Sequence, residues 1–139
     1  MPYPYLLTPF IAWLIAGSIK FLINSLIAKK AATHLIGYGG LPSNHSAIVC
    51  SMVTLIGLRE GIEHPAFGVA VTLAFIVMLD ASSLRKQIGK QAVALNRLAN
   101  IQAPGSSALR ERVGHSLIEI MAGVVVGFLV GSAINHFSA

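Results

Sequence analysis

The chain has 139 residues, of which 55% are hydrophobic and only 11% are charged. This length suits a single domain, and this composition lies outside the range of soluble proteins. We therefore expect one membrane-embedded domain over residues 1–139. The single cysteine, Cys50, excludes an internal disulfide.

Four apolar runs follow one another along the chain: Tyr5–Ala28, Ser43–Leu58, Pro65–Leu84 and Leu117–Ile134. At about 1.5 Å per residue, the first run is long enough for a hydrocarbon core of roughly 30 Å, whereas the second is shorter. The runs predict an all-α fold, an integral membrane bundle of about four transmembrane helices.

The connections between these runs are more polar. Gly37–Leu41 is glycine-rich and predicts a loop, after which the second helix begins near Ser43. Residues 84–98 place apolar side chains on one face and basic ones elsewhere, which predicts an amphipathic interfacial helix. Pro104 and Gly105 mark a loop before the last run.

The basic residues indicate an orientation. Lys29 and Lys30 follow the first run, and six more basic residues lie between the third and fourth runs. Under the positive-inside rule, both basic loops face the cytoplasm and the N-terminus lies outside. We expect an integral protein of a bacterial inner membrane, with no nucleic-acid partner. The net charge of the chain is +5, and this excess of basic residues can be a topology signal alone.

Glycines recur every four residues in the last run, at Gly123, Gly127 and Gly131. They leave one helix face smooth and permit close packing of backbones. The sequence leaves two partners open for this face, another helix of the same chain or a second subunit in a homodimer.

His115 and Glu119 are four residues apart at the start of the last run. Residues at this spacing lie on the same face of a helix, so the carboxylate can accept a hydrogen bond from one imidazole nitrogen. That bond selects the tautomer and raises the basicity of the other nitrogen, which a nucleophilic histidine requires. Surface pairs of this kind are common, but an ionised group inside an apolar helix is costly unless it has a partner, which makes a functional role the default expectation.

His45 lies in the first turn of the second predicted helix, within the stretch "GGLPSNHSA". Free N–H groups and the helix dipole favour an anion at such a position. The alternative is a simple capping turn, in which Ser43 or Asn44 caps the helix and His45 is incidental.

The predicted topology brings these groups to one depth in the membrane. The starts of the second and fourth helices and the end of the third meet at the cytoplasmic edge, near Lys20, about 13 Å before Lys29. Asp80 lies at the same edge and is expected to pair with a cation or with His45. Two histidines, a carboxylate and several cations form a pocket suited to phosphoryl transfer.

"PSNHSA" and the downstream "RERVGHSLIE" resemble the last two motifs of the type 2 phosphatidic acid phosphatase superfamily, P-S-G-H and S-R-x5-H-x3-D. With "LDASSLRKQIGKQAVALN" between them, the chain is similar to a divergent branch of small membrane proteins related to acid phosphatases and vanadium-dependent haloperoxidases. The resemblance covers most of the chain.

The resemblance implies roles for these residues. His115 would be the nucleophile, Glu119 would orient it, and His45 would protonate the leaving alkoxide. The residues expected to bind the substrate phosphate are Lys20, Ser43, Asn44, Arg85, Lys90 and Arg110, with Asp80, Lys86 and Arg112 as possible supporting residues.

The chain departs from the superfamily pattern at several positions. Ile27 and Ala28 replace the Arg-Pro of the first motif, so we infer that Arg85, Lys86 or Lys90 supplies the absent cation. Asn44 replaces the glycine of P-S-G-H and Glu119 replaces the aspartate. Four residues rather than five separate Arg110 from His115.

The predicted function is therefore hydrolysis of a membrane lipid phosphate through a phosphohistidine, with phosphatidylglycerophosphate as one example. No cofactor is expected, and five acidic residues are too few and too scattered for a two-metal site. One rival is a non-enzymatic protein that binds or transports anionic lipids. A haloperoxidase is a second rival, although such enzymes are usually larger and soluble.

Overall fold

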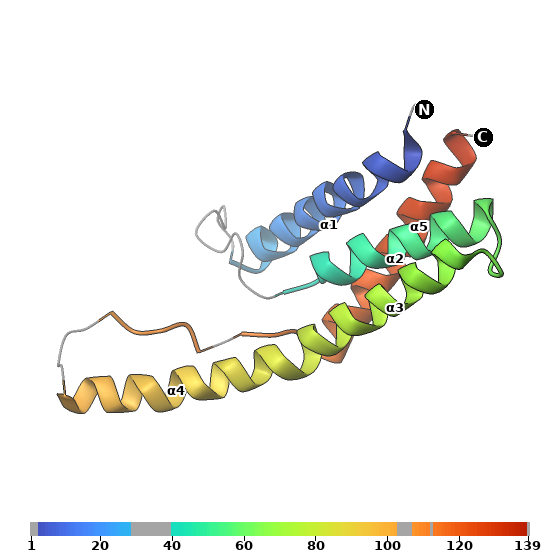
Figure 1. The fold of residues 1–139 in the computed structure, drawn as a ribbon. Coiled ribbons are helices and arrows are strands. Elements are labelled where there is room, and N and C mark those ends of the chain that lie inside the picture. Colours follow the sequence, from blue (N-terminus) through green and yellow to red (C-terminus); the bar gives the residue numbers. More distant parts are fainter. Residues whose placement is uncertain (1–2, 29–39, 103–106, 112, 139) are drawn as a thin grey trace.

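A computed structural model describes residues 3–28, 40–102, 107–111 and 113–138 of the chain (Figure 1). All regular structure in these ranges is helical. The elements are α1 (Pro4–Ala28), α2 (Asn44–Arg59), α3 (Pro65–Leu79), the short π-helical segment η2 (Asp80–Leu84), α4 (Arg85–Gln102) and α5 (Leu117–Phe137).

The helices α1, α2, α3 and α5 form a bundle in which α2 contacts all three others. At one end, the Ser43 N–H donates to the backbone oxygen of Glu119 at 2.9 Å, so α2 and α5 begin side by side. At the other end, Arg59 donates to the Asn135 side chain at 3.3 Å and to the Ser138 backbone oxygen at 2.7 Å. These contacts place the starts of α2 and α5 at the same end of the bundle.

Three of the described helices, not the predicted four, are long and apolar enough to cross a membrane: Pro4–Ile27, Pro65–Ala99 and Leu117–Phe137. The exception is α2, whose 16 residues span only about 24 Å. Polar side chains such as Ser46 and Ser51 are fully buried on α2, because its neighbours cover it. The predicted count of four spans was wrong for this reason, whereas the all-α membrane fold is confirmed.

The glycine face of α5 packs against α2 of the same chain. A Cβ atom added to Gly123, Gly127 or Gly131 would lie 2.4–2.6 Å from a backbone oxygen of α2. All three glycines are buried. The partner of this face is therefore another helix of the same chain, whereas the homodimer stays a prediction.

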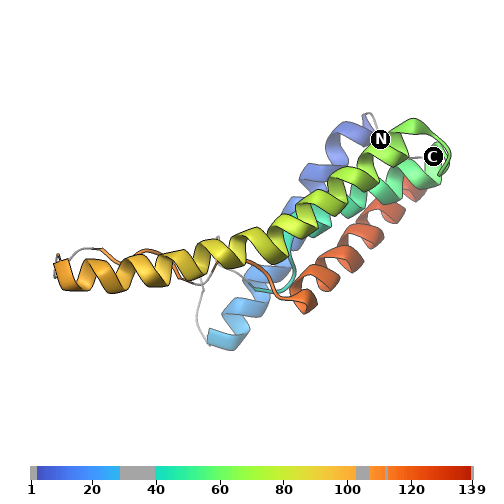
Figure 2. The same cartoon turned by 60° about the horizontal axis from the view of Figure 1, so that its bottom comes forward.

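The helices α3 and α4 form one continuous rod with η2 between them. The backbone runs from α3 through η2 into α4 without a break, and α4 extends beyond the rest of the bundle (Figures 1 and 2). The predicted separate interfacial helix is thus the outer half of this rod. Apolar side chains such as Ile88, Leu95 and Leu98 remain exposed on it.

A strap formed by residues 107–111 runs back along α4 toward the bundle. The Asn96 side chain, which is 9% exposed, donates to the Leu109 backbone oxygen at 2.8 Å and accepts from the Leu109 N–H at 2.7 Å. Gly89 lets the strap approach closely, since a Cβ atom there would lie 2.5 Å from the Glu111 oxygen. The strap leads directly to His115.

We expect Gly127→Ala to destabilise the protein by about 1–3 kcal/mol, because its Cβ would lie 2.6 Å from the Ala47 oxygen and overpack the contact. Gly68→Ala on α3 is the matched control, since a Cβ atom there meets nothing within 4 Å. The control should be neutral or more stable by up to about 1 kcal/mol. Thermal unfolding in detergent compares the two variants, and equal stability would contradict the close packing of α2 on α5.

Candidate active site

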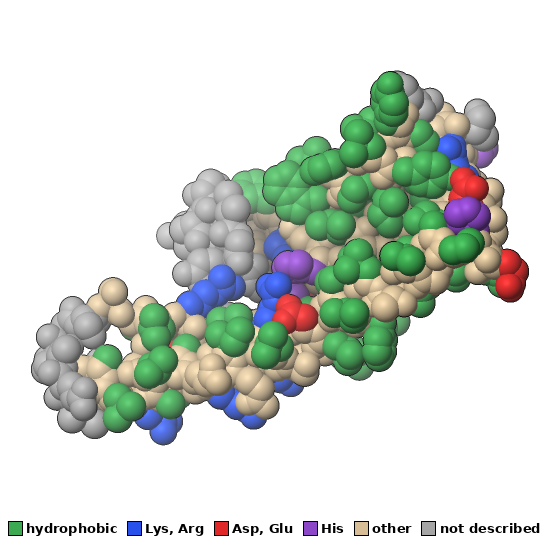
Figure 3. Space-filling model, in the orientation of Figure 1, with side chains coloured by type: hydrophobic (Ala, Val, Ile, Leu, Met, Phe, Trp, Pro, Cys, Tyr) green, Lys and Arg blue, Asp and Glu red, His purple; other side chains and the backbone are tan. Residues whose placement is uncertain are grey.

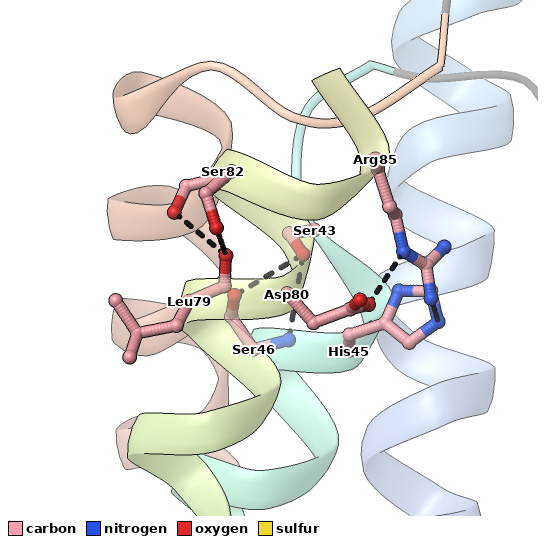
Figure 4. Close-up of polar contacts among 8 residues, drawn as sticks. Ser43, His45, Ser46, Leu79, Asp80, Ser82 and Arg85 are labelled. Carbon is pink, nitrogen blue, oxygen red and sulfur yellow. Dashed lines mark hydrogen bonds and ion pairs between the residues drawn. The ribbon is translucent and has the colours of Figure 1, made fainter. Parts of the chain in front are cut away.

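The π-helical segment η2 brings two charged side chains together. The backbone N–H of Arg85 donates to the backbone oxygen of Asp80, five residues earlier. The Arg85 side chain therefore lies almost above that of Asp80. In a regular α-helix, residues five apart would point about 140° away from each other. The Arg85 Nε donates to Asp80 Oδ2 at 2.9 Å (Figure 4).

The same segment holds the backbone of His115. In an α-helix, the backbone N–H of Arg85 would donate to the Ala81 oxygen. Here it donates to the Asp80 oxygen instead, so the Ala81 oxygen is left for another donor. The His115 N–H donates to that Ala81 oxygen at 3.0 Å. Gly114 precedes it with φ +103°, a left-handed conformation that favours glycine, and lies against the Lys86 backbone nitrogen.

His115 and Glu119 form the predicted pair. The distance from His115 Nδ1 to Glu119 Oε2 is 3.2 Å, and the side chains are only 8% and 12% exposed. A carboxylate can only accept, so Nδ1 carries a proton, and in the neutral ring Nε2 presents a free lone pair. The Ser116 N–H also donates to Glu119 Oε2, at 2.8 Å, which completes a capping box at the start of α5.

His45 lies in the first turn of α2 and contacts Arg85. The distance from Arg85 Nη2 to His45 Nε2 is 3.3 Å (Figure 4). Arginine has only donors, so Nε2 accepts and the ring proton is assigned to Nδ1. Nδ1 is buried without a hydrogen-bond partner among the described residues. His45 is therefore neutral in this arrangement.

The two imidazoles are neighbours, although 70 residues separate them in the chain. Their ring centroids are 6.1 Å apart and their planes are inclined by 55°. The spatial proximity that the site prediction requires is therefore present.

Lys20 completes the surroundings of the histidines from α1. Its ammonium group interacts electrostatically with Glu119 and with both imidazoles. Burial, followed by the positive charge of Arg85, holds the pKa of His45 below its ordinary value. Burial also lowers the pKa of His115, although the bond to Glu119 opposes that shift. The empty site therefore favours two neutral imidazoles.

Ser43 and Asn44 have different environments from those expected. Ser43 is fully buried, its N–H bonds to Glu119, and its hydroxyl accepts from the Ser46 N–H at 3.4 Å and the Ser46 hydroxyl at 3.1 Å. Ser43 thus caps α2 and joins it to α5. The Asn44 side chain lies near Gly17, and its Oδ1 atom is buried without a partner among the described residues.

The remaining predicted cations lie outside the histidine cluster or outside the described residues. Lys86 and Lys90 are exposed on α4. Arg110 is exposed on the strap, next to Leu109, which bonds to Asn96. Asn96 lies eleven residues after Arg85, which is about 16 Å farther along the helix. Arg112 lies outside the described residues, as do Lys29 and Lys30.

Sequence reasoning missed the structural elements that hold the site together. The Ala81 oxygen and the π turn carry no side-chain signal, whereas the spacing of Ser116 and Glu119 is a recognisable capping box. No group of three or more His, Cys, Asp or Glu side chains that could hold a metal ion occurs in the part of the chain that the structure describes.

The site reaches the molecular surface where the rod leaves the bundle. A histidine side chain lies there beside Lys or Arg and Asp or Glu side chains, next to a surface covered by hydrophobic side chains (Figure 3). The exposed apolar residues nearby include Leu22 on α1 and Leu79 and Leu84 on the rod. A ligand with a charged head and an apolar tail would match this combination of surfaces.

Comparisons with known proteins identify the family of the chain. Residues 2–130 match the model of the divergent PAP2 family, so the chain belongs to that family. It is 29% identical to "Uncharacterized membrane protein YuiD" of Bacillus subtilis (strain 168), over 95% of this chain and 94% of that protein. No solved structure shows significant similarity. The predicted family is confirmed, and the chain is a membrane protein.

We expect Glu119→Gln to lower the pKa of His115 further. The carboxylate charge stabilises the protonated ring, and this substitution removes that charge. Histidine side-chain NMR of the detergent-solubilised protein measures this titration. Glu63→Gln, an exposed change in the turn between α2 and α3, is the control and should leave His115 unchanged. An unaltered His115 titration in Glu119→Gln would show that the carboxylate does not support the ring.

Proposed function

We propose that this member of the divergent PAP2 family hydrolyses a phosphomonoester of a membrane lipid through a phosphohistidine intermediate. The observation that carries the proposal is the pair of imidazoles, 6.1 Å apart between centroids, with Arg85 bonded to one and Glu119 to the other. A phosphoryl group held beside both rings would be within reach of a nucleophile and of an acid.

His115 is the proposed nucleophile. Glu119 accepts the Nδ1 proton and holds the ring, so the Nε2 lone pair is free for in-line attack on phosphorus. A Nε2–P bond forms while the bond from phosphorus to the ester oxygen breaks. Glu119 then stabilises the positive charge that develops on the ring.

Arg85 and Lys20 are the proposed cations for the phosphate oxygens. The transition state of phosphoryl transfer spreads negative charge over three equatorial oxygens, and preorganised positive groups stabilise it, a contribution often worth several kcal/mol. Lys20 interacts with both histidines and Arg85 contacts His45. Ser43 supports the site from inside, because its N–H bonds to Glu119 and its hydroxyl oxygen accepts from Ser46.

His45 is the proposed acid and base. A bound phosphate dianion supplies acceptors for Arg85 and negative charge beside the ring, and both favour a proton on His45. His45 gives that proton to the departing alkoxide oxygen. In the second step it takes a proton from water, which attacks phosphorus and releases inorganic phosphate and free His115.

The hydrophobic surface beside the site favours a lipid as the substrate. The phosphate would enter the polar end of the bundle while the hydrocarbon chains remain in the membrane. Phosphatidylglycerophosphate, phosphatidic acid and polyprenyl phosphates all meet this requirement. The proposed orientation places the site at the cytoplasmic side of a bacterial inner membrane, where the positive-inside rule puts the basic α4.

The alternative is a protein that binds or transports anionic lipids without chemistry. Such a protein would use the same cations. The bond between His115 and Glu119 favours the enzyme, because a binding site gains little from a buried imidazole whose free nitrogen is kept unprotonated.

We expect His115→Ala and His45→Ala each to reduce phosphate release from lipid phosphomonoesters by at least about 10³-fold, because each removes a group that makes or breaks a bond. His136→Ala is the matched control, since His136 is exposed near the opposite end of the bundle. Phosphate release is measured across a panel of purified lipid phosphates in mixed micelles. Turnover at the wild-type rate in His115→Ala would exclude the phosphohistidine.

We also expect kcat/KM to decline at a lower pH than kcat. The first parameter reports the free enzyme, in which the pKa of His45 is lowered, and the second reports the complex, in which bound phosphate restores the proton. Both decline as pH rises, because the acid must be protonated. Initial rates across pH at several substrate fractions separate the two profiles, and coincident profiles would argue against this role of His45.

A further inference from the structure

The Arg85 side chain is long and flexible, yet it makes two directed contacts in the empty site. Its Nε donates to Asp80 at 2.9 Å and its Nη2 donates to His45 at 3.3 Å (Figure 4). Both Arg85 and Asp80 are 34% exposed, so burial alone does not restrain the guanidinium. Something other than packing must keep it beside His45.

Asp80 can restrain the Arg85 guanidinium only because of the π turn. Residues five apart share a helix face in η2, where the Arg85 N–H bonds to the Asp80 oxygen. The same turn leaves the Ala81 oxygen to accept the His115 N–H at 3.0 Å. Residues 80–85 thus contact both histidines, His45 through the Arg85 side chain and His115 through the Ala81 backbone oxygen.

We propose that Asp80 is a positioning residue that holds the Arg85 guanidinium against His45 Nε2, in the register that the π turn of η2 creates. This inference deepens the proposed hydrolysis and rests on it for its catalytic consequence. Asp80 itself touches neither the substrate nor the reacting atoms. Its effect reaches the site only through Arg85.

The arrangement determines when His45 can act. While Arg85 donates to Nε2, that nitrogen cannot carry the proton for the leaving group. Phosphate oxygens are stronger acceptors for a guanidinium than a neutral imidazole, so a bound substrate draws Nη2 away. The charged and titratable groups around His45 are Lys20 from α1, Asp80 and Arg85 from the rod, and the pair His115 and Glu119 at the start of α5.

Histidine NMR of the solubilised full-length protein tests the placement without requiring activity. Asp80→Ala should raise the pKa of His45, because Arg85 is released from contact with the ring. A carboxylate that acted only through its own charge would have the opposite effect, since its loss disfavours the imidazolium. A fall or no change in the His45 titration would overturn the proposal.

The Arg85→Gln background provides the matched comparison. There Asp80 has no guanidinium to hold, so adding Asp80→Ala should lower the pKa of His45 instead of raising it. The sign of the effect therefore reverses between the two backgrounds. The same sign in both would show that Asp80 does not act through Arg85.

Two further variants guard against a failure to fold. Arg85→Lys keeps the cation but lacks the fork that reaches two acceptors, so the His45 titration should shift upward as in Asp80→Ala. Asp80→Glu keeps the carboxylate and should recover part of the wild-type value. An unshifted His45 titration in Arg85→Lys would also overturn the proposal.

The catalytic consequence is measured separately. Asp80→Ala should reduce kcat/KM for a short-chain phosphatidic acid on the order of 10²-fold, as expected for a misplaced phosphate ligand. Asp80→Glu should be intermediate, and Glu63→Gln should match the wild type. A wild-type protein that releases no phosphate from any lipid would overturn the proposed hydrolysis, whereas the NMR test of Asp80 would remain decisive.

Discussion

The close contact between α2 and α5 is the constraint on which the site depends. Three glycines of α5 allow the backbone oxygens of Ser43, Ala47 and Ser51 to approach within distances that no Cβ atom would permit. In a membrane, helices gain little from hydrophobic burial, so such backbone proximity is a main source of association. The hydrogen bond from the Ser43 N–H to the Glu119 oxygen then fixes the two helix starts against each other. His45 and His115 are neighbours because each stands within four residues of that bond.

A second constraint comes from the π turn between α3 and α4. An extra residue in a helical turn changes the direction of every later side chain and leaves one carbonyl without its usual partner. Here the change in direction places Arg85 over Asp80, and the unused Ala81 oxygen anchors His115. The rod is therefore more than a candidate membrane span. Its Arg85 side chain contacts His45, and its Ala81 oxygen holds the backbone of His115.

The sequence predicted that His45, His115 and Glu119 lie close together, but not the architecture that brings them together. His45, His115 and Glu119 were predictable because motif spacing and helical periodicity report side-chain identity and facing. The role of Ser43 was not predictable, since a serine at a helix start can bind a ligand or cap the helix, and here its polar groups bond internally. The count of three spans was not predicted either, because the sequence of α2 resembles a short apolar span. Only the structure shows that neighbouring helices bury α2 and its serines Ser46 and Ser51. A π turn leaves no pattern of residue types at all.

The charges around the two imidazoles suggest how such a site would select its ligand. Lys20 and Arg85 lie near the rings, the nearby acids Glu119 and Asp80 are each bonded to a partner, and the pKa values of both histidines are lowered by burial in the empty site. A phosphomonoester near neutral pH brings almost two negative charges, which satisfy the cations and favour the protonated form of His45. A phosphodiester brings only one charge and would leave that ring less protonated. Selection for the monoester would therefore arise from charge balance at the site, in addition to any fit of the lipid chains.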